Sequence, residues 1–143
     1  MRKEVHSLEE LAALAQHWLS QVPASERGAT VVGLIGNLGS GKTAFTQAVG
    51  RELGITEALT SPTFVIQKSY ELKGQPWSKL VHIDAYRLQS GKELLALGWS
   101  ELVATPRTLV LVEWADQVET VLPVGTPRLH FKFINEQTRE ISS

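Results

Sequence analysis

With 143 residues the chain has about the length of one ordinary domain, so we expect a single domain over residues 1–143. A composition of 43% hydrophobic and 20% charged residues excludes an intrinsically disordered chain, and a net charge of −1 excludes an overall electrostatic attraction to DNA or to an anionic membrane. The chain has no cysteine for disulfides or thiolate metal sites, and no stretch of the roughly 20 apolar residues that span a membrane, so we expect a cytoplasmic protein.

The first part of the sequence predicts a helix, a buried strand and a second helix. Ser7 begins a capping box, and apolar residues then recur at helical spacing over residues 8–20. Residues 29–35 are almost all apolar or β-branched, which indicates a buried strand. From Lys42 the apolar residues again have the period of a helix, and Gly54 is a typical terminator just beyond its end.

The rest of the sequence predicts mainly strands. Residues 64–72 and 79–86 have strand composition, and the turn residues 73–76 between them predict an antiparallel hairpin. A strand–helix start combined with hairpins predicts an α/β fold, a three-layer domain whose mixed, partly parallel sheet is flanked by helices. The remaining expected elements are a short helix over residues 91–97, a buried strand over 109–114, and closing strands over 128–133 and 139–142.

A phosphate-binding motif lies between the first predicted strand and the second helix. It matches G-x-x-x-x-G-K-[ST], and its glycines let successive backbone N–H groups point at phosphate oxygens beside a helix N-terminus. The lysine is expected to contact the β- and γ-phosphates and the threonine hydroxyl to bind Mg²⁺, so we predict a bound nucleoside triphosphate with magnesium. With this motif, the expected α/β fold is P-loop NTPase-like. The alternative is a chance match in a glycine-bearing turn. The predicted nucleotide-binding residues of this loop are Gly36, Asn37, Leu38, Gly39, Ser40, Gly41, Lys42 and Thr43.

Two carboxylates follow apolar strands. Asp84 ends the run at residues 80–83, and Glu113 ends the run at 109–112, so both are expected at strand ends beside the nucleotide. Either could bind Mg²⁺, directly or through water; a surface carboxylate, or an ion pair with a base such as Arg87, is the alternative for each.

His82 stands two residues before Asp84 and is therefore expected on the same face of its strand. It could orient the Asp84 carboxylate, or it could be a histidine packed in the core.

A polar loop, T-S-P-T-F at residues 60–64, precedes the predicted hairpin. Its proline favours extended backbone, and the loop resembles a switch segment. The Thr63 hydroxyl would then approach the γ-phosphate and its metal. A plain loop whose threonine caps the next strand is the alternative.

These motifs, in this order and spacing, resemble the TsaE (YjeE) family of small bacterial ATPases. The resemblance rests on residues 36–43, 61–64 (S-P-T-F), 82–87 (H-I-D-A-Y-R) and 112–114 (V-E-W). It implies an ATP-binding protein and a Mg²⁺-dependent ATPase, weak by itself, that is required for threonylcarbamoyladenosine modification of tRNA. It also implies partnership with the TsaB–TsaD heterodimer, which ATP hydrolysis would reset between turnovers, so that tRNA is involved through that complex.

The resemblance further implies a role for each matching residue. Lys42 would bind phosphate, and Thr43 and Glu113 match the magnesium ligands. Asp84 matches the acid implicated in hydrolysis, and Thr63 matches the switch position, so these two are the expected catalytic residues.

Two more residues are matched to the nucleotide, and three positions in and beside the glycine loop depart from the family. Trp114 falls on the tryptophan beside the metal glutamate, and Arg139 resembles a C-terminal arginine that reaches the nucleotide. The family usually has G-D-L-G-A-G-K-T-T, whereas this chain has Asn37, Ser40 and Ala44. Asn37 removes a negative charge, which brings turnover into question and leaves binding unaffected.

Three other functions use the same loop. A small-molecule P-loop kinase would employ Asp84 as base for an acceptor hydroxyl, but no arginine-rich lid is evident. A GTP-dependent switch would carry an N-K-x-D signature, which does not occur. A protein whose nucleotide only stabilises a partner interface stays compatible with every residue named.

Overall fold

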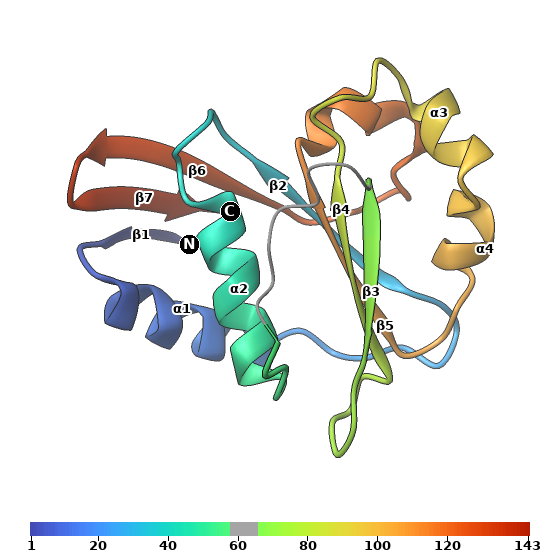
Figure 1. Cartoon of the computed structure of the whole chain (residues 1–143), viewed down its shortest axis with the longest axis horizontal. Helices are drawn as coiled ribbons and strands as arrows, with labels where there is room; N and C mark the ends of the chain where they lie inside the picture. Colours follow the sequence, from blue (N-terminus) through green and yellow to red (C-terminus); the bar gives the residue numbers. More distant parts are fainter. Residues whose placement is uncertain (58–65) are drawn as a thin grey trace.

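The computed structural model describes residues 1–57 and 66–143. The predicted switch residue Thr63, with the rest of its loop, lies outside the described residues. In the described part the strands form one seven-stranded sheet in the order β1-β7-β6-β2-β5-β4-β3 (Figure 1). The strands are β1 Arg2–Val5, β2 Thr30–Ile35, β3 Gln67–Glu71, β4 Lys79–Asp84, β5 Thr108–Glu113, β6 Arg128–Asn135 and β7 Thr138–Ser142.

Parallel pairing brings the carboxyl ends of the central strands to one edge of the sheet. β2 pairs in parallel with β5 and with β6, and β4 pairs in parallel with β5. β3 pairs with β4, and β7 with β6 and β1, in antiparallel fashion. The predicted mixed α/β sheet, its hairpin and its closing strand pair are thus confirmed.

Helices cover both faces of the sheet (Figure 1). α1 Leu8–Ser20 and α2 Lys42–Glu52 pack on one face, and α3 Gly91–Ala96, α4 Trp99–Val103 and the 3₁₀ helix η1 Ala115–Val121 on the other. No helix in residues 1–57 and 66–143 combines the length and apolarity needed to cross a membrane.

Strand β5 shows how the sheet divides the core into two layers. Leu109 and Leu111 belong to the apolar cluster that includes α1 and α2, whereas Val110 and Val112 belong to the cluster under α3, α4 and η1. All four side chains are fully buried. Because both faces of β5 are covered, the strand appears in the sequence as a continuous apolar run.

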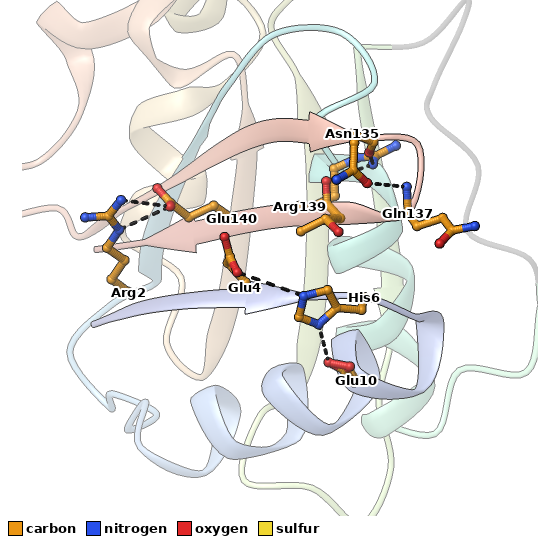
Figure 2. Close-up of polar contacts among 9 residues, drawn as sticks. Arg2, Glu4, His6, Glu10, Asn135, Gln137, Arg139 and Glu140 are labelled. Atoms are coloured by element: carbon orange, nitrogen blue, oxygen red, sulfur yellow. Dashed lines mark hydrogen bonds and ion pairs between the residues drawn. The ribbon is translucent and has the colours of Figure 1, made fainter.

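The first helix begins where its capping signal predicts. The Oγ atom of Ser7 accepts a hydrogen bond from the backbone N–H of Glu10 at 3.1 Å. The Glu10 carboxylate, however, lies 3.0 Å from Nδ1 of His6, with Glu4 on the other side of that ring (Figure 2). Only the Ser7 half of the capping box is therefore seen.

Three elements of the structure are not predicted by the sequence pattern. β1 lies at the sheet edge with three of its four residues exposed, so it shows no alternation of apolar side chains. α4 has only five residues, which is too short for a helical period. α4 and η1 each follow a residue with positive φ, Gly98 and Trp114 respectively.

Candidate nucleotide-binding site

The glycine loop joins the carboxyl end of β2 to the start of α2. Gly39 and Gly41 have φ values of 76° and 108°, which side chains with a Cβ rarely adopt. A Cβ on Gly36 would lie 2.5 Å from the Phe131 carbonyl oxygen and 2.6 Å from Ser40 Oγ. Glycine at these positions therefore follows from the shape of the loop itself.

The N-terminus of α2 points into this loop. Its N-cap is Gly41, and among the described residues no side chain caps it and no acidic residue lies in its first turn. The first N–H groups of a helix have no partner within the helix, and the helix dipole favours negative charge there. This end of α2 can therefore accept an anion such as phosphate.

Lys42 is turned into the loop and almost fully buried, with 4% of its surface exposed. Its Nζ donates hydrogen bonds to the carbonyl oxygens of Gly36 and Asn37, the latter at 2.9 Å, and lies 4.3 Å from the ring centroid of Trp114. Burial lowers the pKa of the ammonium group, while the negative charges of Glu113 and other nearby carboxylates oppose that shift. The lysine thus lies inside the predicted phosphate cradle.

Glu113 lies at the end of β5 and accepts hydrogen bonds from two side chains. Thr43 Oγ1 lies 2.9 Å and 3.1 Å from the two carboxylate oxygens. His82 Nε2 lies 2.5 Å from Glu113 Oε2. Glu113 is 3% exposed, His82 is fully buried and Thr43 is half-buried, so the three side chains form a polar cluster that is largely shielded from solvent.

The partner of His82 differs from the one that its spacing suggests. In the parallel pair of β4 and β5, His82 is in register with Leu111, and Asp84 with Glu113. The imidazole contacts Glu113, two residues beyond Leu111 on the neighbouring strand, instead of Asp84 on its own strand. Sequence separation along one strand does not reveal this contact, because it crosses between strands.

Asp84 and Trp114 lie beside this cluster. Asp84 ends β4, and its Oδ1 accepts a hydrogen bond from the Tyr86 N–H at 3.0 Å. Trp114 follows Glu113 in a left-handed conformation, with φ of 57°, and its ring lies 5.0 Å from that of Tyr86. Positive φ is uncommon for a bulky residue and often marks functional sites.

A cavity of about 800 Å³ connects these groups. Of the predicted site residues that the structure describes, Gly36 and Asn37 do not line it and contribute carbonyl oxygens to Lys42 instead. Thr63 lies outside the described residues. The predicted residues that line the cavity are Leu38, Gly39, Ser40, Gly41, Lys42, Thr43, Asp84, Glu113, Trp114 and Arg139.

The cavity extends beyond the predicted site to segments that the motif analysis did not single out. His6, Leu8 and Leu11, at the start of α1, line it together with Glu136 and Gln137 from the turn between β6 and β7. No phosphate or metal motif includes these positions. The sequence pattern predicts only the beginning of a helix around Leu8 and a connection between two strands at residues 136 and 137.

Arg139 borders the cavity from β7 and holds the loop. Its Nε donates to the Gly39 carbonyl oxygen at 2.9 Å, and one terminal nitrogen donates to the Asn135 oxygen at 2.6 Å. Its guanidinium carbon also lies 4.5 Å from the Phe133 ring centroid. Figure 2 shows Arg139 beside Asn135 and Gln137 at this turn. The predicted nucleotide arginine is therefore engaged with the backbone of the glycine loop.

Thr43 and Glu113 are suited to Mg²⁺ only with further ligands. No cluster of three or more His, Asp, Glu or Cys side chains within residues 1–57 and 66–143 could hold a metal ion by itself. Mg²⁺ prefers oxygen ligands and is commonly bound by one or two carboxylates together with substrate phosphates and water. The adjacent hydroxyl and carboxylate oxygens fit an ion that arrives with a nucleotide.

Known proteins match the chain over most of its length. The family model described as "Threonylcarbamoyl adenosine biosynthesis protein TsaE" matches residues 5–141. The tRNA threonylcarbamoyladenosine biosynthesis protein TsaE of Bacillus subtilis is 38% identical over 112 residues, which cover 78% of this chain and 67% of that protein. The protein of the same name from Treponema pallidum is 35% identical over 117 residues, 82% of each chain. The crystal structure of Bacillus subtilis YdiB aligns with a TM-score of 0.76 at 30% identity, over 99% of this chain and 82% of that one.

Proposed function

Since the chain belongs to the TsaE family of tRNA threonylcarbamoyladenosine biosynthesis, we propose that it binds ATP with Mg²⁺ and hydrolyses the ATP to support that modification. The observation that carries the proposal is the meeting of Lys42, Thr43 and Glu113 in one cavity. A cation for phosphate, a hydroxyl and a carboxylate for the metal, and an uncapped helix N-terminus are the parts that phosphoryl transfer requires.

The order of the strands in the sheet supports one orientation of the nucleotide in the cavity. β5 and β4 lie on one side of β2, and β6, β7 and β1 lie on the other. A triphosphate seated on the loop after β2 would turn its γ-phosphate toward Glu113 and Asp84. Its base would then extend toward Leu8, Leu11 and Gln137 at the other end of the cavity. Apolar side chains beside an amide suit a purine ring, and we take this purine to be adenine.

Each residue of the site then has a task. Lys42 would exchange the carbonyl oxygens of Gly36 and Asn37 for phosphate oxygens. Thr43 and Glu113 would hold Mg²⁺, which neutralises charge on the β- and γ-phosphates when bound. Asp84, in register with Glu113, would orient the attacking water and accept its proton.

A partner completes the proposed function. We infer that hydrolysis resets the TsaB–TsaD heterodimer between rounds of modification in the cytoplasm. The support is family membership, together with a net charge of −1 that offers tRNA no overall electrostatic attraction. In this scheme tRNA is contacted through the complex.

Phosphate release measured with and without TsaB–TsaD tests the proposal. Wild-type protein should release phosphate slowly alone and faster with the partners, and Lys42→Ala and Glu113→Ala should both lose the stimulated rate. Loss of one charge-assisted contact costs about 1.5–3 kcal/mol, so Lys42→Ala should weaken nucleotide binding at least about tenfold. Phosphoryl transfer to a small metabolite without partners would instead identify a kinase.

A further inference from the structure

We propose that His82 is a positioning residue that fixes the Glu113 carboxylate for the magnesium–nucleotide complex. The inference rests on the proposed function, because it concerns the same site, but it assigns a role to a residue outside the expected ligand set. His82 lies on β4 and is fully buried, so it acts on the metal only through Glu113.

The contact between His82 and Glu113 has a defined direction. A carboxylate can only accept hydrogen bonds, so the imidazole Nε2, 2.5 Å from Glu113 Oε2, carries the donated proton. The other ring nitrogen, Nδ1, is buried and has no hydrogen-bond partner among the described residues. Burying a polar atom without a partner is costly, and an apolar residue would avoid that cost. The contact at Nε2 is therefore what histidine adds at this position.

The lone pairs of the Glu113 carboxylate show what the hydrogen bond from His82 achieves. The Glu113 carboxylate has about four acceptor positions, of which His82 takes one on Oε2. Thr43 Oγ1 has a single proton to donate and lies closer to Oε1, at 2.9 Å, than to Oε2, at 3.1 Å. The hydroxyl oxygen keeps its own lone pairs, and Oε1 keeps one more. Thr43 and Oε1 thus offer adjacent oxygens to a cation while both carboxylate oxygens stay held.

Removal of the His82 imidazole should release the Oε2 side of the Glu113 carboxylate. Glu113 would lose its donor at Oε2 and could rotate toward Lys42, whose charge it already feels. Metal binding would then have to order the carboxylate, which costs affinity for the metal and leaves the phosphate contacts of the loop intact. Substitution of residues that orient metal ligands typically lowers metal affinity by about 10–100-fold.

Two amide variants separate positioning from packing. In His82→Gln the amide nitrogen can reach the place of Nε2, whereas in His82→Asn the shorter side chain reaches only the place of Nδ1. Leu80→Val is the matched control, because Leu80 is buried on the same face of β4 and two residues away. It should lower the Tm without changing the response to Mg²⁺.

The experiment is a titration of each purified full-length variant with AMP-PNP and with ADP, with and without Mg²⁺. In His82→Asn the Mg²⁺ concentration for half-maximal enhancement of AMP-PNP binding should rise about 10–100-fold, while metal-free affinity stays unchanged. His82→Gln should stay close to wild type. Thermal unfolding of each variant reports packing separately.

Three results would overturn the inference. A wild-type Mg²⁺ response in His82→Asn would show that the donor is not needed, and an equal loss in folded His82→Gln and His82→Asn would show a packing effect. If wild-type protein binds AMP-PNP with no Mg²⁺ enhancement, the proposed function itself fails. A normal wild-type response with an unaffected His82→Asn overturns only the role of His82.

Discussion

The ammonium nitrogen of Lys42 lies 4.3 Å from the ring centroid of Trp114. Lys42, which we propose to bind phosphate, is therefore in contact with Trp114, which directly follows the proposed metal ligand Glu113. A cation over an indole face is attracted by the ring quadrupole. Movement of Lys42 toward phosphate would weaken this contact, which makes Trp114 a reporter of nucleotide binding.

Trp114 fluorescence should change when ATP or ADP binds. The chain has four tryptophans, of which Trp77 and Trp99 are buried in the core and Trp18 packs against Phe45 on α2. The response should disappear in Trp114→Phe, whereas Trp18→Phe should retain it. A signal that persists unchanged in Trp114→Phe would contradict the displacement of Lys42 from this ring.

Lys42 should make stability depend on alkaline pH. Burial lowers its folded-state pKa below the ordinary value of 10.5, and the Glu113, Asp84 and Asp116 carboxylates oppose part of the shift. Between the lowered pKa and 10.5 the unfolded chain binds more protons than the folded one, so the free energy of unfolding rises with pH across that window. The destabilisation caused by burying the charged Lys42 is fully present below its lowered folded-state pKa and absent above the pKa of the unfolded chain.

Urea unfolding from neutral pH to about pH 10.5 measures this dependence. The wild type should gain stability with rising pH relative to Lys42→Met, which carries no charge at that position. Lys68→Met is the control, because Lys68 on β3 is exposed, and it should follow the wild type. Parallel curves for the wild type and Lys42→Met would show that burial does not penalise the charged lysine.

The fold was predictable wherever a strand is covered on both faces. Residues 109–112 form a continuous apolar run because β5 lies inside the sheet, and the strand expected over 109–114 matches the observed Thr108–Glu113 within a residue. The edge strand β1 lacks such a signal, since three of its four residues are exposed and Val5 alone is buried in the core. Its pairing with β7 depends on partners almost the whole chain length away.

Part of the candidate site followed from the same logic. Asp84 and Glu113 were expected at strand ends, and the register pairs them directly. The contact of His82 with Glu113 could not be predicted, because it depends on which strands are neighbours and on side-chain reach across them. The Arg139 contact with Gly39 likewise joins positions 100 residues apart. Such contacts belong to the tertiary structure and have no local pattern.

Arg139→Ala should weaken nucleotide binding by loosening the loop. Its side chain donates to the carbonyl oxygens of Gly39 and Asn135, and hydrogen bonds from a charged donor are each worth about 1.5–3 kcal/mol. Because the side chain is partly exposed, we expect a loss of about 1 kcal/mol, or about fivefold in Kd, by calorimetry with ADP.

Arg2→Ala provides the matched control for this arginine. Arg2 pairs with Glu140 on β7 at 3.1 Å, but its side chain is 78% exposed and lies away from the loop (Figure 2). Exposed ion pairs contribute little, so Kd should stay within experimental error. An equal loss of affinity in both variants would mean that the β-hairpin as a whole, and not the contact with Gly39, supports the loop.

Asp84→Asn should separate nucleotide binding from hydrolysis. The amide keeps an oxygen that can accept from the Tyr86 N–H, so the end of β4 should fold as in the wild type. It cannot accept a proton from water, and loss of a general base typically lowers turnover by about 10²–10⁴-fold. Stimulated phosphate release should therefore fall by this factor while ADP affinity changes little.

Asp116→Asn is the matched control for this prediction. Asp116, on η1, also carries a negative charge that acts on Lys42, and its substitution should retain turnover. If both variants lose activity to the same degree, Asp84 acts through its charge on Lys42 and not as a base.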